Sequence, residues 1–203
     1  LHMISKLKKN KGIAGFLLAN GALNDSDTKS IRKRIIENNL VEAIIILPRD
    51  TFYSTDISVT LWIINKDKKA HAGNIGEKKV NFRDREDEVL FMDLRHQGSV
   101  FEKKYIELTP EDIGNISSIY HDWQTDKKNY EDIPEFCKTV KKSEIAKNDY
   151  SLVPSLYIDF VDKTNQINYE KEMTRISAEV KKILFEEQDA CTRLEKAMGV
   201  IDA

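Results

Sequence analysis

The sequence has few cysteines and no long apolar run, and both shortages narrow the class of protein. Its two cysteines, Cys137 and Cys191, lie far apart and fit no metal-ligand spacing. We therefore expect two reduced thiols in a cytoplasmic protein rather than a disulfide framework. No apolar run approaches the roughly 20 residues of a membrane-spanning helix. The first ten residues lack the apolar centre of a signal peptide, so no membrane partner is expected.

An excess of charge of either sign is also missing. Charged residues make up 33% of the chain, yet the net charge is -2. This balance argues against a wholly basic nucleic-acid coat but allows a local basic patch. The histidines are scattered along the chain, so no metal site is predicted. The charge run at 84–88 (DREDE) is interpreted as a solvated loop.

Residues 13–65 carry the clearest structural pattern. Short β-branched apolar runs at 13–19, 41–47 and 57–65 are typical of strands buried on both faces. A helical pattern at 28–38, with its isoleucines on one face and Arg and Lys on the other, separates the first two runs, which predicts a parallel βαβ unit. The loop at 48–56 is too short for a crossover helix, so the third strand should run antiparallel to the second.

The remaining chain gives weaker signals. Residues 67–88 are polar and are predicted to be a loop, and 89–94 a further strand. Thr109 followed by Pro110 indicates the start of a helix that ends near Trp123. A short helix at 142–147 is expected to be capped by Ser143.

A long charged helix is predicted from residue 168 onward. Its apolar residues recur at alternating three- and four-residue steps over roughly four heptads. They are Met173, Ile176, Val180, Ile183, Ala190, Leu194, Ala197 and Ile201. So narrow a stripe requires a partner helix, which could belong to this chain, to a second copy or to another protein.

Taken together, these segments resemble a known family. The sequence at 15–23 is GFLLANGAL, and that at 41–66 is VEAIIILPRDTFYSTDISVTLWIINK. Both are similar to the last third of the modification subunit of type I restriction systems, an adenine-N6 DNA methyltransferase. The stretches 88–124 and 133–158 resemble the segments that follow in that family.

The resemblance implies an α/β fold. The chain would be the C-terminal portion of a Rossmann-like methyltransferase sheet, with parallel strands, one reversed strand in a hairpin, and a helical extension. It would comprise a partial methyltransferase domain at 1–108, a helix and extended linker at 109–167, and an assembly helix at 168–203.

The motifs that carry the family's chemistry are missing from the sequence. The intact enzyme needs a Gly-rich turn for S-adenosylmethionine and an Asn-Pro-Pro-Phe/Tyr motif for the target adenine. The four prolines here are never adjacent, and Gly12 and Gly15 form no GxGxxG pattern. We therefore expect no catalytic residue in this chain, no cofactor binding and no methylation by the chain in isolation.

One role of the family could nevertheless lie in this chain. Related enzymes flip the target base out of the duplex, and the resemblance implies that Phe52 stacks on it. The alternative is that Phe52 packs over the hairpin while Tyr53 is the exposed ring. Further candidate contacts to DNA or the base lie at strand ends and in the loop. They are Asn20, Arg49, Tyr53 and Thr55, although Asn20 could be only a turn residue and Arg49 only a solvated charge.

Two functions therefore stay open. In the first, the chain is part of a type I DNA methyltransferase subunit, with DNA and the specificity and restriction subunits as partners. In the second, it is a non-enzymatic interaction module whose C-terminal helix docks on the specificity subunit or self-associates as a homodimer.

Overall fold

The computed structural model describes residues 1–125, 129–161 and 169–201, with side chains as far as residue 194. The chain divides into two compact units, Leu1–Phe160 and Val161–Ala203. Within the described residues, we find no helix with the length and apolar character needed to cross a membrane.

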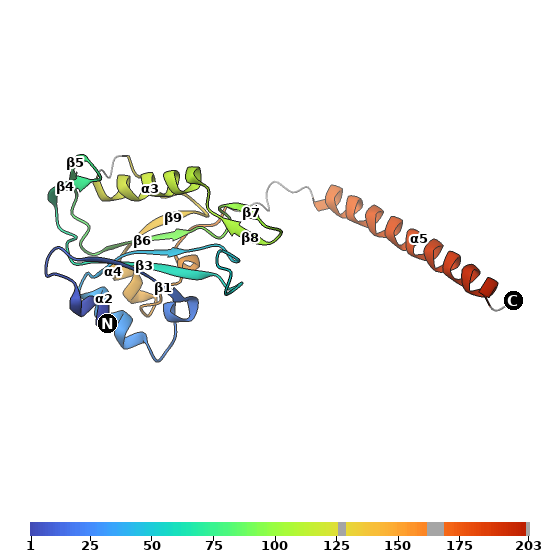
Figure 1. Ribbon diagram of the computed structural model, residues 1–203, viewed down its shortest axis with the longest axis horizontal. Coiled ribbons are helices and arrows are strands. Elements are labelled where there is room, and N and C mark those ends of the chain that lie inside the picture. The colour runs from blue at the N-terminus through green and yellow to red at the C-terminus, as the bar shows by residue number, and fades with distance from the viewer. Residues whose placement is uncertain (126–128, 162–168, 202–203) are drawn as a thin grey trace. The chain divides into compact units, whose positions relative to one another are not determined.

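The first unit is built on a five-stranded mixed sheet in the order β1-β3-β2-β6-β9 (Figure 1). Its strands are β1 (Ile13–Ala19), β2 (Val41–Ile46), β3 (Val59–Asn65), β6 (Glu88–Asp93) and β9 (Cys137–Lys141). β3 runs antiparallel to both of its neighbours, β1 and β2, while β2 and β6 are parallel. The predicted α/β fold with one reversed strand is therefore confirmed, and β9 adds an antiparallel edge strand beside β6.

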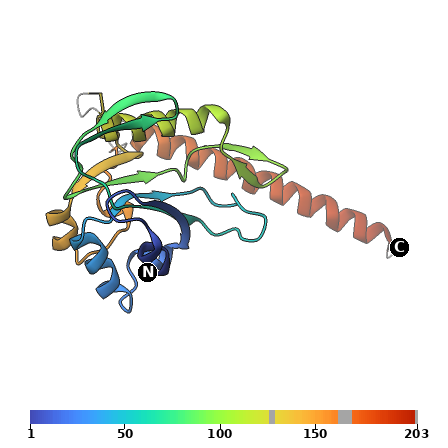
Figure 2. The same ribbon diagram turned by 60° about the vertical axis from the view of Figure 1, so that its left-hand side comes forward.

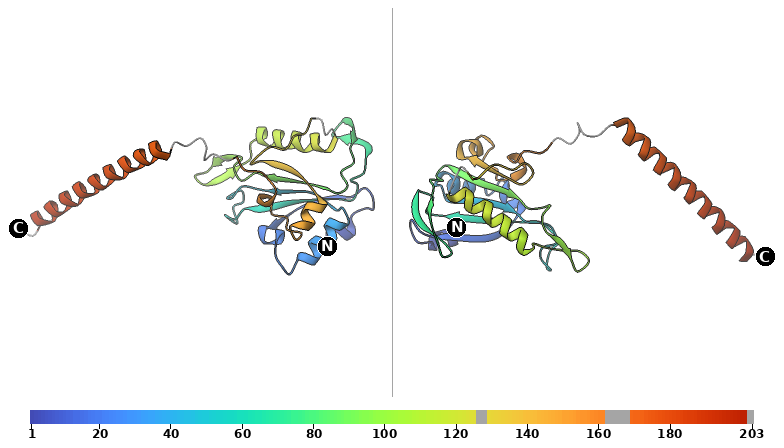
Figure 3. Two further views of the ribbon diagram at one scale, coloured as in Figure 1. Left: turned by 180° about the vertical axis from the view of Figure 1, so that it is seen from behind. Right: turned by 90° about the horizontal axis from the view of Figure 1, so that it is seen from above.

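Apolar layers cover both faces of the sheet. Because side chains alternate along a strand, Ile44, Trp62 and Phe91 enter one core and Ile45, Leu90 and Met92 the other. Figure 1 shows α2 (Lys29–Glu37) and α4 (Lys142–Lys147) on the first face and α3 (Pro110–Thr125) on the second. Seen from above in Figure 3, α3 lies across its face of the sheet.

The first strand departs from the prediction of burial on both faces. Ile13, Leu17 and Leu18 of β1 are 59%, 44% and 37% exposed. The strand pairs only with β3 among the described residues, and Leu17 shares its face with its cross-strand partner Leu61, which packs against the second core. β2, between two partner strands and two apolar layers, is buried throughout.

The polar stretch at 67–88 is not simply a loop. It contains the hairpin β4 (His71–Ile75) and β5 (Lys78–Phe82), joined by a two-residue turn in which Gly76 has a φ of +58°. The charge run at 84–88 is not wholly solvated either, since Arg85 is 1% exposed. A second hairpin, β7 (Ser99–Phe101) and β8 (Tyr105–Glu107), was also missed.

The helices follow most of the sequence signals. α1 spans His2–Lys6, and the 3₁₀ turns are η1 (Asn20–Leu23) and η2 (Pro154–Leu156). Thr109 caps α3, because the Asp112 backbone N–H donates to Thr109 Oγ1 at 3.1 Å. The predicted Ser143 cap of α4 is wrong, since the helix begins after Lys141 with no side-chain cap.

One charged residue of α2 lies on its buried side, contrary to the predicted division of that helix. Arg32 is 3% exposed. Its guanidinium donates to the carbonyls of Asp25 and Tyr150 at 2.7 and 3.0 Å. These bonds tie α2 to the segment after α4.

The second unit contains one long helix, α5 (Tyr169–Ile201). The predicted apolar residues are exposed on it as far as described, with Val180 at 49% and Ile183 at 62%. The side chains of Ala197 and Ile201 lie outside those described.

Candidate functional site

The candidate site lies at the carboxyl edge of the parallel strands. β1, β2 and β6 point the same way, since β3 is antiparallel to β1 and β2, and β6 is parallel to β2. Asn20 follows β1, Pro48 lies just after β2, and β6 ends at Asp93. Open α/β sheets bind ligands beyond this edge. A ligand or substrate site is therefore expected beside these strand ends.

The β2–β3 loop, residues 48–58, is the central feature of this edge. It is fixed to the sheet at its base, where the Leu47 N–H donates to the Val59 carbonyl at 2.9 Å. The buried Ser58 hydroxyl donates to the Leu47 carbonyl at 2.6 Å. The loop therefore extends from a fixed hairpin. A fixed scaffold of this kind can hold functional loop residues at defined positions.

The tip of the β2–β3 loop carries two neighbouring aromatic rings. Its backbone turns tightly, with the Thr55 N–H donating to the Phe52 carbonyl at 3.3 Å. Phe52 is half-buried, and Tyr53 is 72% exposed. The rings thus differ in environment, and the stacking role predicted for Phe52 stays a prediction.

The other candidate contacts have partners inside the protein. Asn20 Oδ1 accepts a hydrogen bond of 2.6 Å from the buried Thr60 hydroxyl, which fixes the carboxamide at the end of β1. Arg49 Nε donates to the Asp56 carbonyl at 3.3 Å across the base of the loop. Thr55 Oγ1 accepts from the Ile57 N–H at 3.2 Å. The structure therefore brings Arg49, Tyr53 and Thr55 together on one loop, with Asn20 on the neighbouring strand end.

Sequence reasoning missed the β7–β8 hairpin as part of this edge. Its Ile106 N–H donates to the Asp50 carbonyl at 3.0 Å. The ring of Tyr105 meets that of Tyr53 edge to face, with centroids 4.5 Å apart. Figure 2 shows this hairpin extending past the end of the sheet. Alternation in the sequence SVFEKKYIE was the available signal, but a three-residue strand is too short for it to be decisive.

A fixed arginine also lies at this edge. Asp93, at the end of β6, holds Arg95 by a two-pronged contact with Nε–Oδ1 and Nη2–Oδ2 distances of 2.9 and 2.6 Å. These hydrogen bonds raise the pKa of Arg95 above its ordinary value, so the guanidinium stays charged. Its side chain is 41% exposed, which leaves part of the cation facing solvent.

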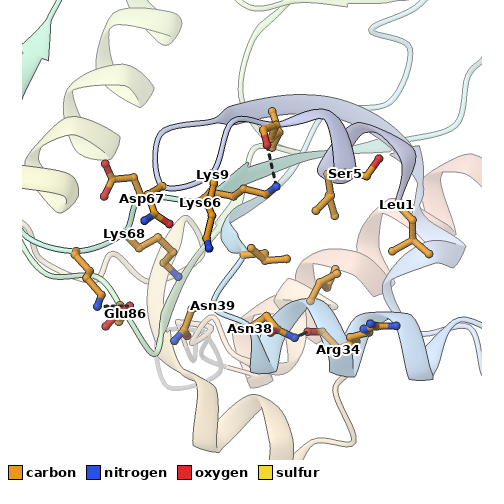
Figure 4. Close-up of a pocket in the computed structure, with 16 residues that line it drawn as sticks. Leu1, Ser5, Lys9, Arg34, Asn38, Asn39, Lys66, Asp67, Lys68 and Glu86 are labelled. Atoms are coloured by element: carbon orange, nitrogen blue, oxygen red, sulfur yellow. Dashed lines mark hydrogen bonds and ion pairs between the residues drawn. The ribbon is translucent and has the colours of Figure 1, made fainter.

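A cavity of about 1120 Å³ lies at the opposite edge of the sheet, beside the residues that precede β2 and follow β3 (Figure 4). Lys9, Arg34, Lys66 and Lys69 are among its lining residues. Asp67 and Glu86 line the cavity as well, so its lining carries charges of both signs. The cavity also lies at the amino edge of the parallel strands rather than the carboxyl edge. Within residues 1–125, 129–161 and 169–201, no group of three or more His, Cys, Asp or Glu is arranged to hold a metal ion.

Comparison with known proteins agrees with this geometry. The family model for N-6 DNA methylases matches residues 1–166. The chain therefore belongs to the N-6 DNA methylase family.

Its similar relatives narrow the subgroup. The chain is 31% identical over 201 residues to the type I restriction enzyme HindI methylase subunit of Haemophilus influenzae, covering 98% of this chain and 42% of that protein. It is 30% identical over 204 residues to the MjaIX methylase subunit of Methanocaldococcus jannaschii, covering 99% and 34%. The chain is also similar to a crystal structure of a type I restriction-modification methyltransferase subunit from Streptococcus thermophilus, with a TM-score of 0.62 and 25% identity, covering 78% of this chain and 29% of that one. The chain thus spans about two fifths or less of these relatives.

Proposed function

We propose that this chain is the part of a type I adenine-N6 DNA methylase subunit that presents the target base to the cofactor. The observation that carries the proposal is the β2–β3 loop. It extends from the carboxyl edge of a methyltransferase sheet and carries Phe52 and Tyr53 at its tip. The division into a partial methyltransferase domain, a linker and an assembly helix belongs to the same proposal, as does a cytoplasmic location alongside DNA.

A flipped base needs an aromatic surface to replace the neighbours it loses in the duplex. Phe52 is half-buried, so its ring can be held in place by protein on one side and still offer the other side to a base. Tyr53 is 72% exposed and is suited to contacts with the surrounding strand. Stacking on one aromatic ring is worth about 1–3 kcal/mol per base.

S-adenosylmethionine and the catalytic Asn-Pro-Pro-Phe/Tyr motif belong to the remainder of the intact enzyme in this proposal. When bound there, the cofactor would supply the methyl group. The residues described here would act on the other reactant: Phe52 would hold the base, and Asn20, Arg49 and Thr55 would line its approach. The chain in isolation is expected neither to bind the cofactor nor to methylate DNA.

The test is Phe52→Ala in an intact methylase subunit that contains this chain, assembled with its specificity subunit. We expect kcat/KM for DNA to fall roughly 5- to 150-fold, while the Kd for S-adenosylmethionine stays within twofold. Phe160→Ala is the matched control, because Phe160 is an exposed phenylalanine outside the site. An equal loss of cofactor affinity and methyl transfer would remove the stacking role.

A second function, assembly, is favoured by α5. The described apolar side chains along the helix are largely exposed. The exposed ones include Met173, Ile176, Val180, Ile183, Leu184 and Leu194. A long helix with such a stripe gains stability by packing against another helix. Helices of the specificity subunit are the proposed partner, with a second copy of this chain as the alternative and the restriction subunit as a further member of the complex.

Light scattering on the isolated chain and pull-down with the specificity subunit test this function. Val180→Glu puts a charge in the stripe and should abolish association through α5, whether with the specificity subunit or with a second copy. Ala178→Glu adds the same charge on the opposite side of α5 and should leave it intact. Equal behaviour of the two variants would show that the stripe is not the contact surface.

A further inference from the structure

We propose that the β7–β8 hairpin is a brace that sets the position of the β2–β3 loop, with Tyr105 as the positioning residue. This inference rests on the proposed function, since it concerns how the loop that carries Phe52 is held. It adds a second segment, from a distant part of the sequence, to the machinery that presents the base.

The brace contacts the loop through its backbone and through a side chain. The Ile106 N–H donates to the Asp50 carbonyl at 3.0 Å, two residues before Phe52. The rings of Tyr105 and Tyr53 meet edge to face at 4.5 Å between centroids, with an interplanar angle of 64°. Tyr53 is next to Phe52, so the two contacts lie on either side of the stacking residue.

The conformation of Asp50 explains why such a contact matters. Its φ is +56°, a left-handed backbone conformation that is uncommon for residues other than glycine. Positions of this kind persist when the surrounding structure holds them. Thr51 Oγ1 also donates to the Pro48 carbonyl at 2.9 Å, so the loop is fixed from its own base and from the hairpin.

The hairpin itself is tightly built. Glu102 and Lys103 have φ values of +45° and +67° at its turn. Gly98 precedes β7 with a φ of +89°, and a Cβ at this position would lie 2.8 Å from the Glu107 carbonyl oxygen. Glycine therefore lets the start of the hairpin approach β8 closely, and the direction of the hairpin depends on it.

The Tyr105 ring connects the β7–β8 hairpin to the β2–β3 loop. Its side chain is half-buried, and Lys104 Nζ lies 5.1 Å from the centroid of its ring, a distance at which a cation and an aromatic face attract each other. The ring thus has a contact from the turn of its own hairpin in addition to its contact with Tyr53. Removing the ring would release the loop without altering any residue that we place against the base.

The test compares variants of an intact methylase subunit containing this chain, assembled with its specificity subunit. Tyr105→Ala should lower kcat/KM for DNA roughly 3- to 10-fold, the range expected for one lost aromatic pair. The Kd for S-adenosylmethionine should not change. Tyr105→Phe keeps the ring and should restore most of the lost activity.

A double-mutant cycle separates positioning from general stability. If Tyr105 acts through the loop, Tyr105→Ala should have little further effect when Phe52 is already alanine. Additive losses in the cycle would overturn the brace. Native activity of Tyr105→Ala, together with impaired activity of Phe52→Ala, would also overturn the brace. The proposed function of Phe52 would stand in that case. If Phe52→Ala has no effect, both proposals fail.

A second variant covers the case in which Tyr105→Ala folds poorly. Gly98→Ala would displace the hairpin without substituting Tyr53 or Tyr105, and it should also lower kcat/KM for DNA. Gly114→Ala is its matched control, because a Cβ on Gly114 of α3 meets nothing within 4 Å. Equal activity of the two glycine variants would contradict the brace.

Discussion

Arg85 and Glu42 form an ion pair inside the first unit. The distance from Arg85 Nε to Glu42 Oε1 is 3.2 Å, and the two side chains are 1% and 0% exposed. Glu42 also accepts hydrogen bonds from Asn65 and Gln124 at 2.5 and 2.8 Å. One carboxylate therefore joins the start of β2 to the end of β3, the end of α3 and the segment before β6.

Replacing Arg85 with methionine should destabilise the protein strongly. The change leaves the Glu42 carboxylate buried without its cation, and breaking a buried pair in this way typically costs about 3–5 kcal/mol. Urea unfolding followed by circular dichroism measures the loss. The double variant Arg85→Met with Glu42→Gln should lose less than the sum of the single variants.

An exposed ion pair nearby provides the control for this prediction. Lys69 Nζ and Glu86 Oε1 lie 4.0 Å apart, and the Lys69 side chain is 73% exposed. Lys69→Met should therefore change stability by less than about 1 kcal/mol. If it costs as much as Arg85→Met, the special role assigned to the buried pair is wrong.

The buried Lys68 should make the free energy of unfolding increase with pH in the alkaline range. The pKa of its ammonium group is lowered to about 8, chiefly by burial and also by the nearby Arg85, while Glu42 and Glu88 oppose the shift. Lys68 Nζ donates to the Val41 and Glu88 carbonyls at 2.8 and 2.5 Å. Above pH 8 the folded state releases a proton that the unfolded state keeps, so this residue makes stability rise with pH.

Between pH 7.5 and 9.5 the contribution of Lys68 to the unfolding free energy should rise by about 2 kcal/mol. The Cys137 thiol, whose pKa is raised by burial, acts in the opposite direction over part of this range. The measured quantity is therefore the difference between the native chain and Lys68→Met, from chemical unfolding at each pH. Parallel curves for the two proteins would contradict the prediction.

The two cysteines should differ in reactivity. Cys137 is buried in the second core and Cys191 is exposed on α5. A thiol reagent needs access to the thiolate, so the native chain should show one fast-reacting thiol and a second only in denaturant. Cys191→Ser should remove the fast reaction. Two fast thiols in the native chain would show that the core around Cys137 opens readily.

Local pattern predicted much of the sheet but few of its long-range contacts. β2 and β3 follow directly from apolar runs and a short loop, and β3 is reversed as loop length requires. The burial of Arg85 was not predictable, because its run of charges carries no sign of the carboxylate 43 residues away. The contact between Tyr105 and Tyr53 could not be predicted from the sequence either. It depends on the direction of the β7–β8 hairpin, which is determined by the tertiary fold. Exposure of Leu17 was mispredicted because an apolar run does not reveal whether a partner covers it.

The exposed β1 strand predicts concentration-dependent association of the isolated chain. Leu17 is 44% exposed, and β1 has a partner strand on only one side within the part of the chain that is described. Such an edge is open to pairing with another chain.

Leu17→Lys should suppress this association, because a lysine on an edge strand disfavours stacking and pairing between molecules. Light scattering over a range of protein concentrations measures it, and Ile113→Lys, a similar change at an exposed position of α3, is the control. Association through α5 is distinguished by its sensitivity to Val180→Glu, so persistence in Leu17→Lys together with loss in Val180→Glu would assign self-association to the helix and rule out the strand.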